Sequence, residues 1–289
     1  MIWHKIEIFC SKENSFFIEE VLIGFGAISL SIEDKSNKPI YEPEIGEHPL
    51  WDKLLISALF DEEINVKSLK NLIGKNFESL KYTKLKDMNW IENYQKDFQS
   101  RRFGQSLWVS PPWDIKEVKE NEIILKIAPG LAFGSGSHET TSLCLEYLDN
   151  NKPIGLSVID YGCGSGILSI ASILLGAKDV LAFDIDPQAL ISAKANALIN
   201  DVEKRVKISF PPDKPRIKSD LLIANILVNQ ILALRKNFSR LLKQRSKLIL
   251  SGIMTHQIDF VIKSYEKEFE LISITRKKEW CLVEFEKSC

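Results

Sequence analysis

The chain has 289 residues, of which 45% are hydrophobic, and its formal net charge is −1. A chain of this length can bury one large core and one smaller core, so we expect two domains. The near-neutral charge argues against a strongly basic nucleic-acid-binding protein.

The five cysteines are odd in number and form no C-x-x-C pair, so the sequence indicates neither a disulfide framework nor a zinc site. No basic-then-apolar signal pattern and no apolar run long enough to cross a bilayer is found, which predicts a cytoplasmic protein. The first 100 residues carry 12 Lys or Arg and 17 Asp or Glu. This acidic front half suits a basic partner, although an ordinary solvated surface would show the same excess.

Residues 1–85 predict a small domain with the element order β-α-β-β-α-β, which is the ferredoxin-like arrangement. The expected strands are 2–10, 27–33, 53–60 and 77–85, because apolar residues alternate along them. The first expected helix carries Phe16, Phe17, Val21 and Leu22, and we expect Asp61 to cap the second. Nothing in this domain is typical of catalysis, so we expect it to recognise a substrate.

Residues 86–105 predict a connecting helix or linker. Trp90, Ile91, Tyr94 and Phe98 recur at helical spacing and would form one apolar stripe. This stripe is more typical of packing between two lobes than of a ligand site.

Residues 106–289 predict a Rossmann-like domain that begins with a glycine-rich segment. An expected strand at 123–128 leads into residues 129–141, which include Phe133, and a helix follows from about Thr141. His138 could be a base or a metal ligand, but no cluster of Cys, His or carboxylates accompanies it. We therefore expect a hydrogen bond that stabilises the loop.

The chain is organised around residues 157–170, where an apolar strand runs into a glycine turn and a helix. Gly162, Gly164 and Gly166 stand at alternate positions, and Asp160 precedes the first of them by two residues. Glycines allow a ligand to approach the backbone closely, and the following helix offers unpaired N–H groups. The next strand, 179–183, ends at Asp184, twenty-two residues after Gly162, where an acid can bind ribose hydroxyls.

The spacing of the turn favours one class of nucleotide ligand. The nicotinamide fingerprint is G-x-G-x-x-G, whereas this turn is G-x-G-x-G. The pattern resembles the S-adenosylmethionine site of Rossmann-like class I methyltransferases. The strand at 220–224 delivers Asn225 to the same sheet edge, and a terminal antiparallel pair is expected at 270–274 and 280–285.

Seven short motifs make the resemblance more specific. They occur in the order and approximate spacing of the bacterial methyltransferase family that modifies the eleventh protein of the large ribosomal subunit. The motifs are Gly130–Gly134, Thr140–Thr141, Asp160–Gly166, Asp184–Pro187, Ala224–Leu227, Leu250–Ile253 and Glu279–Cys281. The front domain and the Trp90 connector also fit, so the resemblance covers nearly the whole chain.

This resemblance implies S-adenosylmethionine-dependent methylation of lysine side chains and an N-terminal α-amine of that ribosomal protein, with the front domain gripping the substrate. It also implies that Thr141, Gly162, Asp184 and Asn225 contact the cofactor. We add Asp160, Gly164, Gly166 and Phe133 to this expected cofactor site, and we expect no metal.

Some positions depart from the family pattern. Ser135 and Ser137 stand where threonines are usual, and their hydroxyls are retained. Glu139 and the pair Gln99 and Ser100 stand where prolines are usual, which bears on loop rigidity and hinge geometry.

The chemistry requires few side chains, because a sulfonium is already an activated methyl donor and alignment of the amine supplies much of the rate. We expect Asn225 to accept hydrogen bonds from the incoming amine, without a dedicated general base. The expected protein is a monomer that binds neither membrane nor specific nucleic acid. Two alternatives stay open: a methyltransferase of a small molecule, another protein or RNA, and a non-catalytic ribosome-assembly protein.

Overall fold

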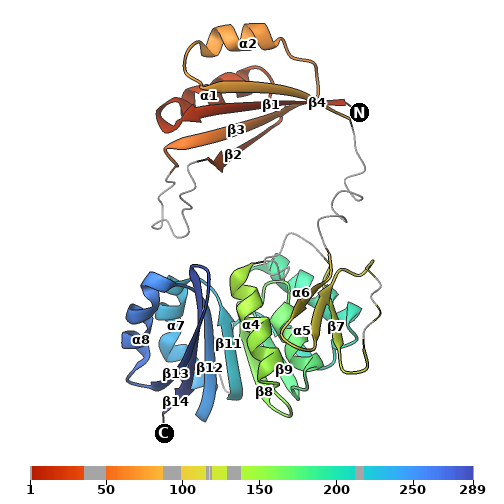
Figure 1. Cartoon of the computed structure of the whole chain (residues 1–289), viewed down its shortest axis with the longest axis vertical. Coiled ribbons are helices and arrows are strands. Elements are labelled where there is room, and N and C mark those ends of the chain that lie inside the picture. The colour runs from red at the N-terminus through yellow and green to blue at the C-terminus, as the bar shows by residue number, and fades with distance from the viewer. Residues whose placement is uncertain are drawn as a thin grey trace. The chain divides into compact units, whose positions relative to one another are not determined.

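The computed structural model describes residues 2–35, 50–86, 99–114, 117, 119–128, 138–211 and 218–288. The chain forms two compact units, residues 1–94 and 95–289 (Figure 1). The predicted connector helix around Trp90 lies outside the described residues.

The first unit has the predicted ferredoxin-like fold. Its elements are β1 (Ile2–Ser11), α1 (Lys12–Gly24), β2 (Ser29–Asp34), β3 (Lys53–Phe60), α2 (Val66–Ile73) and β4 (Ser79–Lys86). The strands form one antiparallel sheet in the order β2-β3-β1-β4, and both helices lie on the same face of it (Figure 1). Alternation along β1 buries Ile6, Ile8 and Cys10, which face the helices in one core.

The structure identifies the inward face of the first predicted helix and corrects the predicted cap of the second. The buried stripe of α1 is formed by Ile18, Val21 and Leu22, whereas Phe16 is 75% exposed and Phe17 is also exposed. Buried Ser15, Ile18 and Leu22 follow i, i+3 and i+7 spacing, and at about 100° per residue Phe16 and Phe17 lie on the opposite side of the helix. The cap of α2 is Asn65 rather than Asp61, because Asn65 Oδ1 accepts a hydrogen bond from the Ser68 N–H at 3.1 Å.

The second unit is built on a seven-stranded sheet. Its strands are β8 (Ser157–Tyr161), β9 (Asp179–Phe183), β10 (Val206–Ser209), β11 (Ser219–Asn225), β12 (Leu242–Met254), β13 (Phe269–Lys277) and β14 (Trp280–Lys287). Their order is β10-β9-β8-β11-β12-β14-β13, and β14 runs in the direction opposite to the other six strands. The predicted terminal antiparallel pair is therefore confirmed.

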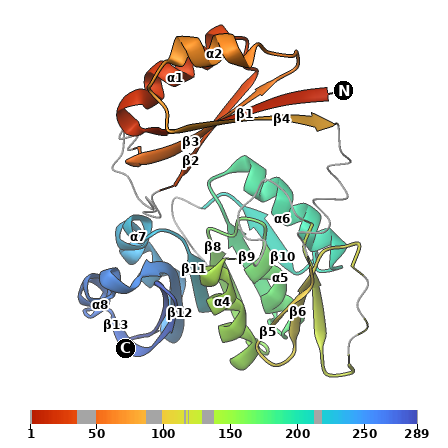
Figure 2. The same ribbon diagram turned by 45° about the horizontal axis from the view of Figure 1, so that its top comes forward.

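Helices cover both faces of this sheet (Figure 2). One face carries α4 (Glu139–Asn150), α5 (Ile167–Leu174) and α6 (Pro187–Ile199), and the other carries α7 (Val228–Leu241) and α8 (Ile258–Tyr265), which follows a short 3₁₀ turn, η1 (Thr255–Gln257). Each layer has its own apolar core against the sheet. None of the helices in the described part of the chain is long and apolar enough to cross a membrane.

Two features of the second unit were not predicted, although the strand at 123–128 within the second of them was. The four-residue strand β10 forms the edge of the large sheet. A separate three-stranded sheet joins β5 (Arg101–Phe103), β6 (Leu107–Ser110) and β7 (Ile123–Lys126), and the Asp149 carboxylate at the end of α4 accepts hydrogen bonds from Gln105 and Ser106 in its hairpin.

The strand order reverses between β8 and its neighbours β9 and β11. Chain connections leave β8 toward β9 on one side and return to β11 on the other, which makes a topological switch point at the carboxyl ends of these strands. Open α/β sheets bind ligands at such a point.

Candidate active site

The glycine turn between β8 and α5 requires the glycines that it contains. Gly162, Gly164 and Gly166 have φ values of 81°, 53° and 79°, a region that residues with a Cβ rarely adopt. A Cβ on Gly166 would lie 3.0 Å from the Cβ of Ala193 on α6, and a Cβ on Gly162 would overlap the side chain of Ile226. The turn is therefore closely packed on both sides.

Hydrogen bonds fix the turn against the end of β9. The N–H groups of Gly162 and Cys163 both donate to the carbonyl oxygen of Phe183, at 2.7 and 2.9 Å, and Gly166 N–H donates to Cys163 O at 2.8 Å. The position of the turn is thus set by β9 as well as by β8.

Asp184 lies at the carboxyl end of β9, as predicted, and faces the glycine turn. Its Oδ2 accepts the Gly164 N–H at 2.9 Å, and its Oδ1 accepts the Asp186 N–H at 3.0 Å. A carboxylate offers about four lone-pair sites. The side chain is half-buried, so each oxygen can still accept one further hydrogen bond.

Asp160 lies within β8, next to the turn, and is only 1% exposed. The Ser169 hydroxyl donates to its Oδ2 at 2.6 Å, whereas Oδ1 is buried without a hydrogen-bond partner. The pKa of Asp160 is raised to about 6, because burial, together with the nearby charge of Asp184, outweighs the hydrogen bonds from Ser169 that lower it. A buried carboxylate with a partnerless oxygen is suited to a cation or a hydrogen-bond donor.

Asn225 and Thr141 come together from elements far apart in the sequence. Asn225 ends β11, and its Nδ2 donates to Thr141 Oγ1 at 3.3 Å. Thr141 is buried in the first turn of α4. This hydrogen bond assigns the amide nitrogen to Thr141 and turns the carbonyl oxygen Oδ1 of Asn225 the other way.

Gly252, which belongs to the Leu250–Ile253 motif, also lies beside these residues. Its φ is 84°, and a Cβ there would overlap the backbone carbonyl of Ile226 in the segment that follows Asn225. Gly252 therefore allows β12 to pack against residues 225–227. Within that segment, the Ile226 side chain packs against Gly162.

Two exposed apolar residues were also missed. Ile185 directly follows Asp184 and is 75% exposed, and Phe210 directly follows β10 and is 55% exposed. Because Ser209 pairs with Phe183, Phe210 lies beside Asp184 at the carboxyl edge of the sheet. An apolar residue directly after the acid of strand two was the available sequence signal.

The remaining predicted site residues have varied outcomes. His138 makes the expected local hydrogen bonds, since its Nδ1 contacts Thr140 Oγ1 at 2.8 Å and caps α4. The described residues contain no cluster of three or more His, Cys, Asp or Glu that could hold a metal. Phe133 lies outside the described residues.

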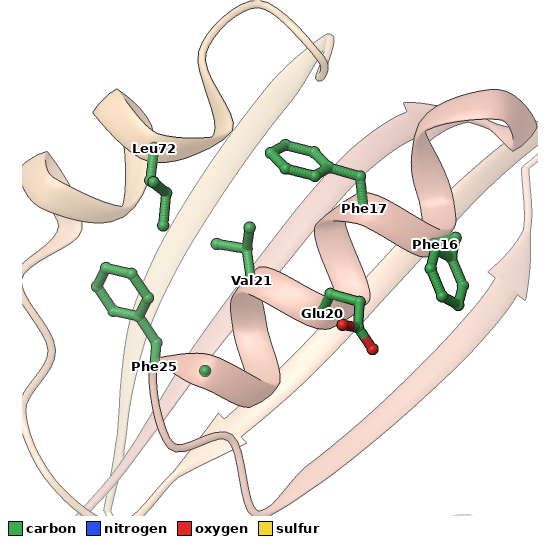
Figure 3. A pocket seen from close by; sticks show the side chains of 7 residues that line it. Phe16, Phe17, Glu20, Val21, Phe25 and Leu72 are labelled. Atoms are coloured by element: carbon green, nitrogen blue, oxygen red, sulfur yellow. The ribbon is translucent and has the colours of Figure 1, made fainter.

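A separate apolar groove of about 560 Å³ lies on the first unit. Phe17, Val21 and Phe25 of α1 and its end face Leu72 of α2 across it, and Glu20 lies along the rim (Figure 3). Leu72 is 56% exposed. The groove therefore presents apolar side chains on the helical face of the ferredoxin-like unit.

Comparisons with known proteins agree with this architecture. Residues 2–288 match the model of the PrmA family, described as ribosomal protein L11 methyltransferase. Ribosomal protein L11 methyltransferases from Histophilus somni (strain 129Pt) and Marinomonas sp. (strain MWYL1) are 39% and 37% identical to the chain. The first alignment covers 98% of this chain and 97% of the relative, and the second covers 97% of each. A crystal structure of ribosomal protein L11 methylase from Lactobacillus delbrueckii subsp. bulgaricus is 30% identical, with a TM-score of 0.62 over 66% of this chain and 100% of the other. The chain therefore belongs to the ribosomal protein L11 methyltransferase (PrmA) family and is an S-adenosylmethionine-dependent methyltransferase.

Proposed function

We propose that this enzyme methylates amino groups of ribosomal protein L11, namely lysine side chains and the N-terminal α-amine, in the cytoplasm. The observation that carries the proposal is the orientation of Asn225, whose Nδ2 is bound to Thr141 while its Oδ1 faces away as an acceptor for an amine. The direct test is incubation with labelled S-adenosylmethionine and purified L11, followed by mass spectrometric mapping. Label on hydroxyl, carboxyl or RNA groups instead of amines would contradict it.

The residues around the glycine turn fit an adenosyl sulfonium amino acid. The second lone pairs of the Asp184 oxygens suit the two ribose hydroxyls, and the partnerless Oδ1 of Asp160 suits a positive group. Exposed Ile185 and Phe210 supply apolar contact for an adenine ring. When bound, the cofactor supplies an activated methyl group on a sulfonium. We therefore propose Thr141, Asp160, Gly162, Gly164, Gly166, Asp184 and Asn225 as cofactor-binding residues, together with Phe133.

Proton loss from the amine is the demanding part of the reaction. A lysine with a pKa of about 10.4 costs roughly 4 to 5 kcal/mol to neutralise at pH 7, whereas an α-amine near 7.7 to 8.0 costs only about 1 kcal/mol. Desolvation lowers the pKa of either amine. In this proposal Asn225 Oδ1 accepts a hydrogen bond from the incoming amine and orients its lone pair toward the methyl group, with no dedicated general base.

The variant Asn225→Ala tests this role. We expect kcat at saturating cofactor and L11 to fall by about tenfold or more, since one positioning hydrogen bond is lost in the transition state. Asn151→Ala is a matched control, because Asn151 lies at the opposite end of α4, where its Nδ2 donates to the Tyr147 carbonyl. Full turnover by Asn225→Ala under these conditions would refute the role.

We further propose that the first unit binds the protein substrate through the groove between α1 and α2. An exposed apolar patch with an acidic rim suits a partner that presents apolar side chains beside basic ones. Glu20 lies on this rim, and the first 100 residues are acidic in balance. A protein that binds RNA is generally basic, so we expect the charge of a ribosomal protein substrate to complement this surface.

Single charge insertions in the groove provide the test. Phe17→Asp and Leu72→Asp should raise the KM for L11 while the affinity for S-adenosylhomocysteine stays unchanged, because the cofactor site lies in the other unit. Phe260→Asp, at an apolar position on α8 that is 63% exposed, is the control. If both groove variants methylate L11 with unchanged KM, recognition takes place elsewhere.

A further inference from the structure

Asn196 is a buried polar residue of α6 that neither the sequence nor the site described above uses. It is 1% exposed and lies on the inward stripe of α6 beside Ala193 and Ala197. These alanines bring the helix close to the sheet, and Ala193 contacts Gly166 of the glycine turn. Asn196 therefore projects from the helix that packs directly on the turn.

Both ends of the Asn196 amide are engaged, by two segments that are otherwise remote. Its Nδ2 donates to the carbonyl oxygen of Ser165 in the glycine turn at 2.9 Å, and its Oδ1 accepts the N–H of Ala128 at 3.0 Å. Ser165 is itself buried, between Gly164 and Gly166. One side chain thus joins the turn to the chain that leaves β7.

A second asparagine one helical turn later shows what part of this arrangement is structural. Asn200 accepts the Lys126 N–H at 2.8 Å, donates to the Lys126 carbonyl at 2.6 Å and donates to the Asn196 carbonyl of its own helix at 2.8 Å. The opposite edge of β7 pairs with β6, where Ile127 N–H donates to Ser110 O at 2.9 Å. Asn196 and Asn200 together therefore pair with the second edge of β7 as a fourth strand would, and Asn196 also bonds to the glycine turn.

We propose that Asn196 is a positioning residue for cofactor binding, which holds the Ser165 peptide and the end of β7 in one geometry. This inference rests on the proposed cofactor role of the glycine turn. The Ser165 carbonyl belongs to the same peptide unit as the Gly166 N–H, which donates to Cys163. Fixing that carbonyl sets the orientation of the peptide unit in the centre of the turn, where backbone atoms meet the ligand.

The test compares Asn196→Ala with Asn200→Ala by calorimetric titration of S-adenosylhomocysteine and by thermal unfolding. Both variants should lower Tm, because each leaves backbone groups of β7 without a partner. Only Asn196→Ala should weaken binding, by about tenfold, and should raise the KM for S-adenosylmethionine while kcat at saturation changes less than about twofold. Equal weakening by both variants, or a lower Tm with unchanged affinity for Asn196→Ala, would overturn the inference.

Asn196→Asp separates the two hydrogen bonds of the amide. A carboxylate still accepts from Ala128 but cannot donate to Ser165, so its affinity should fall as it does in the alanine variant. Affinity equal to that of the wild type would overturn the inference. If the substituted proteins do not fold, hydrogen exchange in the wild-type enzyme decides: the Ala128 amide should gain protection when S-adenosylhomocysteine binds, and no gain would overturn it. Absence of binding by the wild-type enzyme would instead refute the proposed cofactor site.

Discussion

The free wild-type enzyme should lose stability between acid and neutral pH, and replacing Asp160 with asparagine should remove this loss. The same substitution should weaken cofactor binding. The substitution keeps an oxygen that can accept from the Ser169 hydroxyl and removes the charge from a side chain that is almost fully buried. It also replaces Oδ1, which is buried without a hydrogen-bond partner, by an amide NH₂ group that would lack an acceptor at the same place. The two effects oppose each other, and their balance depends on pH.

The magnitude follows from the pKa of Asp160, which burial raises from 3.8 to about 6. The folded protein then holds the proton more tightly than the unfolded chain. This contribution to stability is complete below pH 3.8 and is lost as the pH rises through about 6. The full change corresponds to roughly 3 kcal/mol for the ionised carboxylate. Between about pH 4.5 and about pH 8 the wild type should lose roughly 2 kcal/mol that the variant keeps.

Urea unfolding at these two pH values measures the difference directly. An unpaired amide costs about 1 to 3 kcal/mol at either pH, so the variant should be less stable than the wild type in acid and similar or more stable at the higher pH. Matched unfolding of Asp220→Asn controls for general charge effects, because Asp220 is a partly exposed carboxylate whose pKa is lowered: burial alone would raise it, but the hydrogen bonds from Lys243 and Ser157 outweigh that effect.

A constant difference between Asp160→Asn and wild type across this pH range would refute the argument for a protonated, buried acid. The cofactor supplies a second criterion. A positive ligand favours the ionised carboxylate, so the affinity of the wild type for S-adenosylmethionine should rise as the pH increases through about 6. In the variant this dependence should disappear.

Three further substitutions have defined outcomes. Gly252→Ala should lower the unfolding free energy by about 2 kcal/mol or more and reduce turnover, because its Cβ would overlap the Ile226 carbonyl at positive φ; chemical denaturation and a methylation assay measure both. Phe210→Ala should weaken S-adenosylhomocysteine binding by about 1 kcal/mol in a calorimetric titration without lowering Tm, since the ring is exposed. Glu284→Ala should cost on the order of 2 kcal/mol in urea at pH 7. Burial raises the pKa of Glu284, but the hydrogen bonds from Lys247 and two hydroxyl groups outweigh this and hold it below 4.5, so the wild-type advantage should be lost as the pH falls below that value.

The sequence sufficed where structure is set by local chemistry. The glycine turn, Asp184 and the following helix occupy one continuous segment, and the positive φ values at 162, 164 and 166 require the residue type that is found there. Strands β3 and β9 have the predicted boundaries, because alternation or an apolar run is bounded by turn residues on each side. The roles of the site residues stay proposals until the variants are measured.

Local sequence patterns could not predict contacts between residues that lie far apart in the sequence. Asn196 reaches Ala128 across 68 positions and Ser165 across 31, and nothing local in α6 distinguishes it from a solvent-facing asparagine. The apolar residues of α1 do not by themselves identify its inward face, because Phe16 and Phe17 are as apolar as Ile18, and packing on the sheet selects the stripe that contains Ile18. Strand β10 has only four residues, with a lysine among them, and pairing with β9 decides its conformation.

Methyl transfer changes the charge that the site must hold. The donor carries a positive sulfonium and the product a neutral sulfur, so carboxylates that attract the donor lose part of that attraction once the methyl group has left. Asp160 and Asp184 repel each other electrostatically and so form one negative region beside the turn. Asp160→Asn should therefore weaken the binding of S-adenosylmethionine more than the binding of S-adenosylhomocysteine. The additional loss of affinity should be a factor of about five, or on the order of 1 kcal/mol. Titration of both ligands at about pH 8, where the wild-type carboxylate is ionised, measures the two losses. Equal losses would mean that Asp160 acts on the amino acid part that donor and product share, and that discrimination between them arises from other groups.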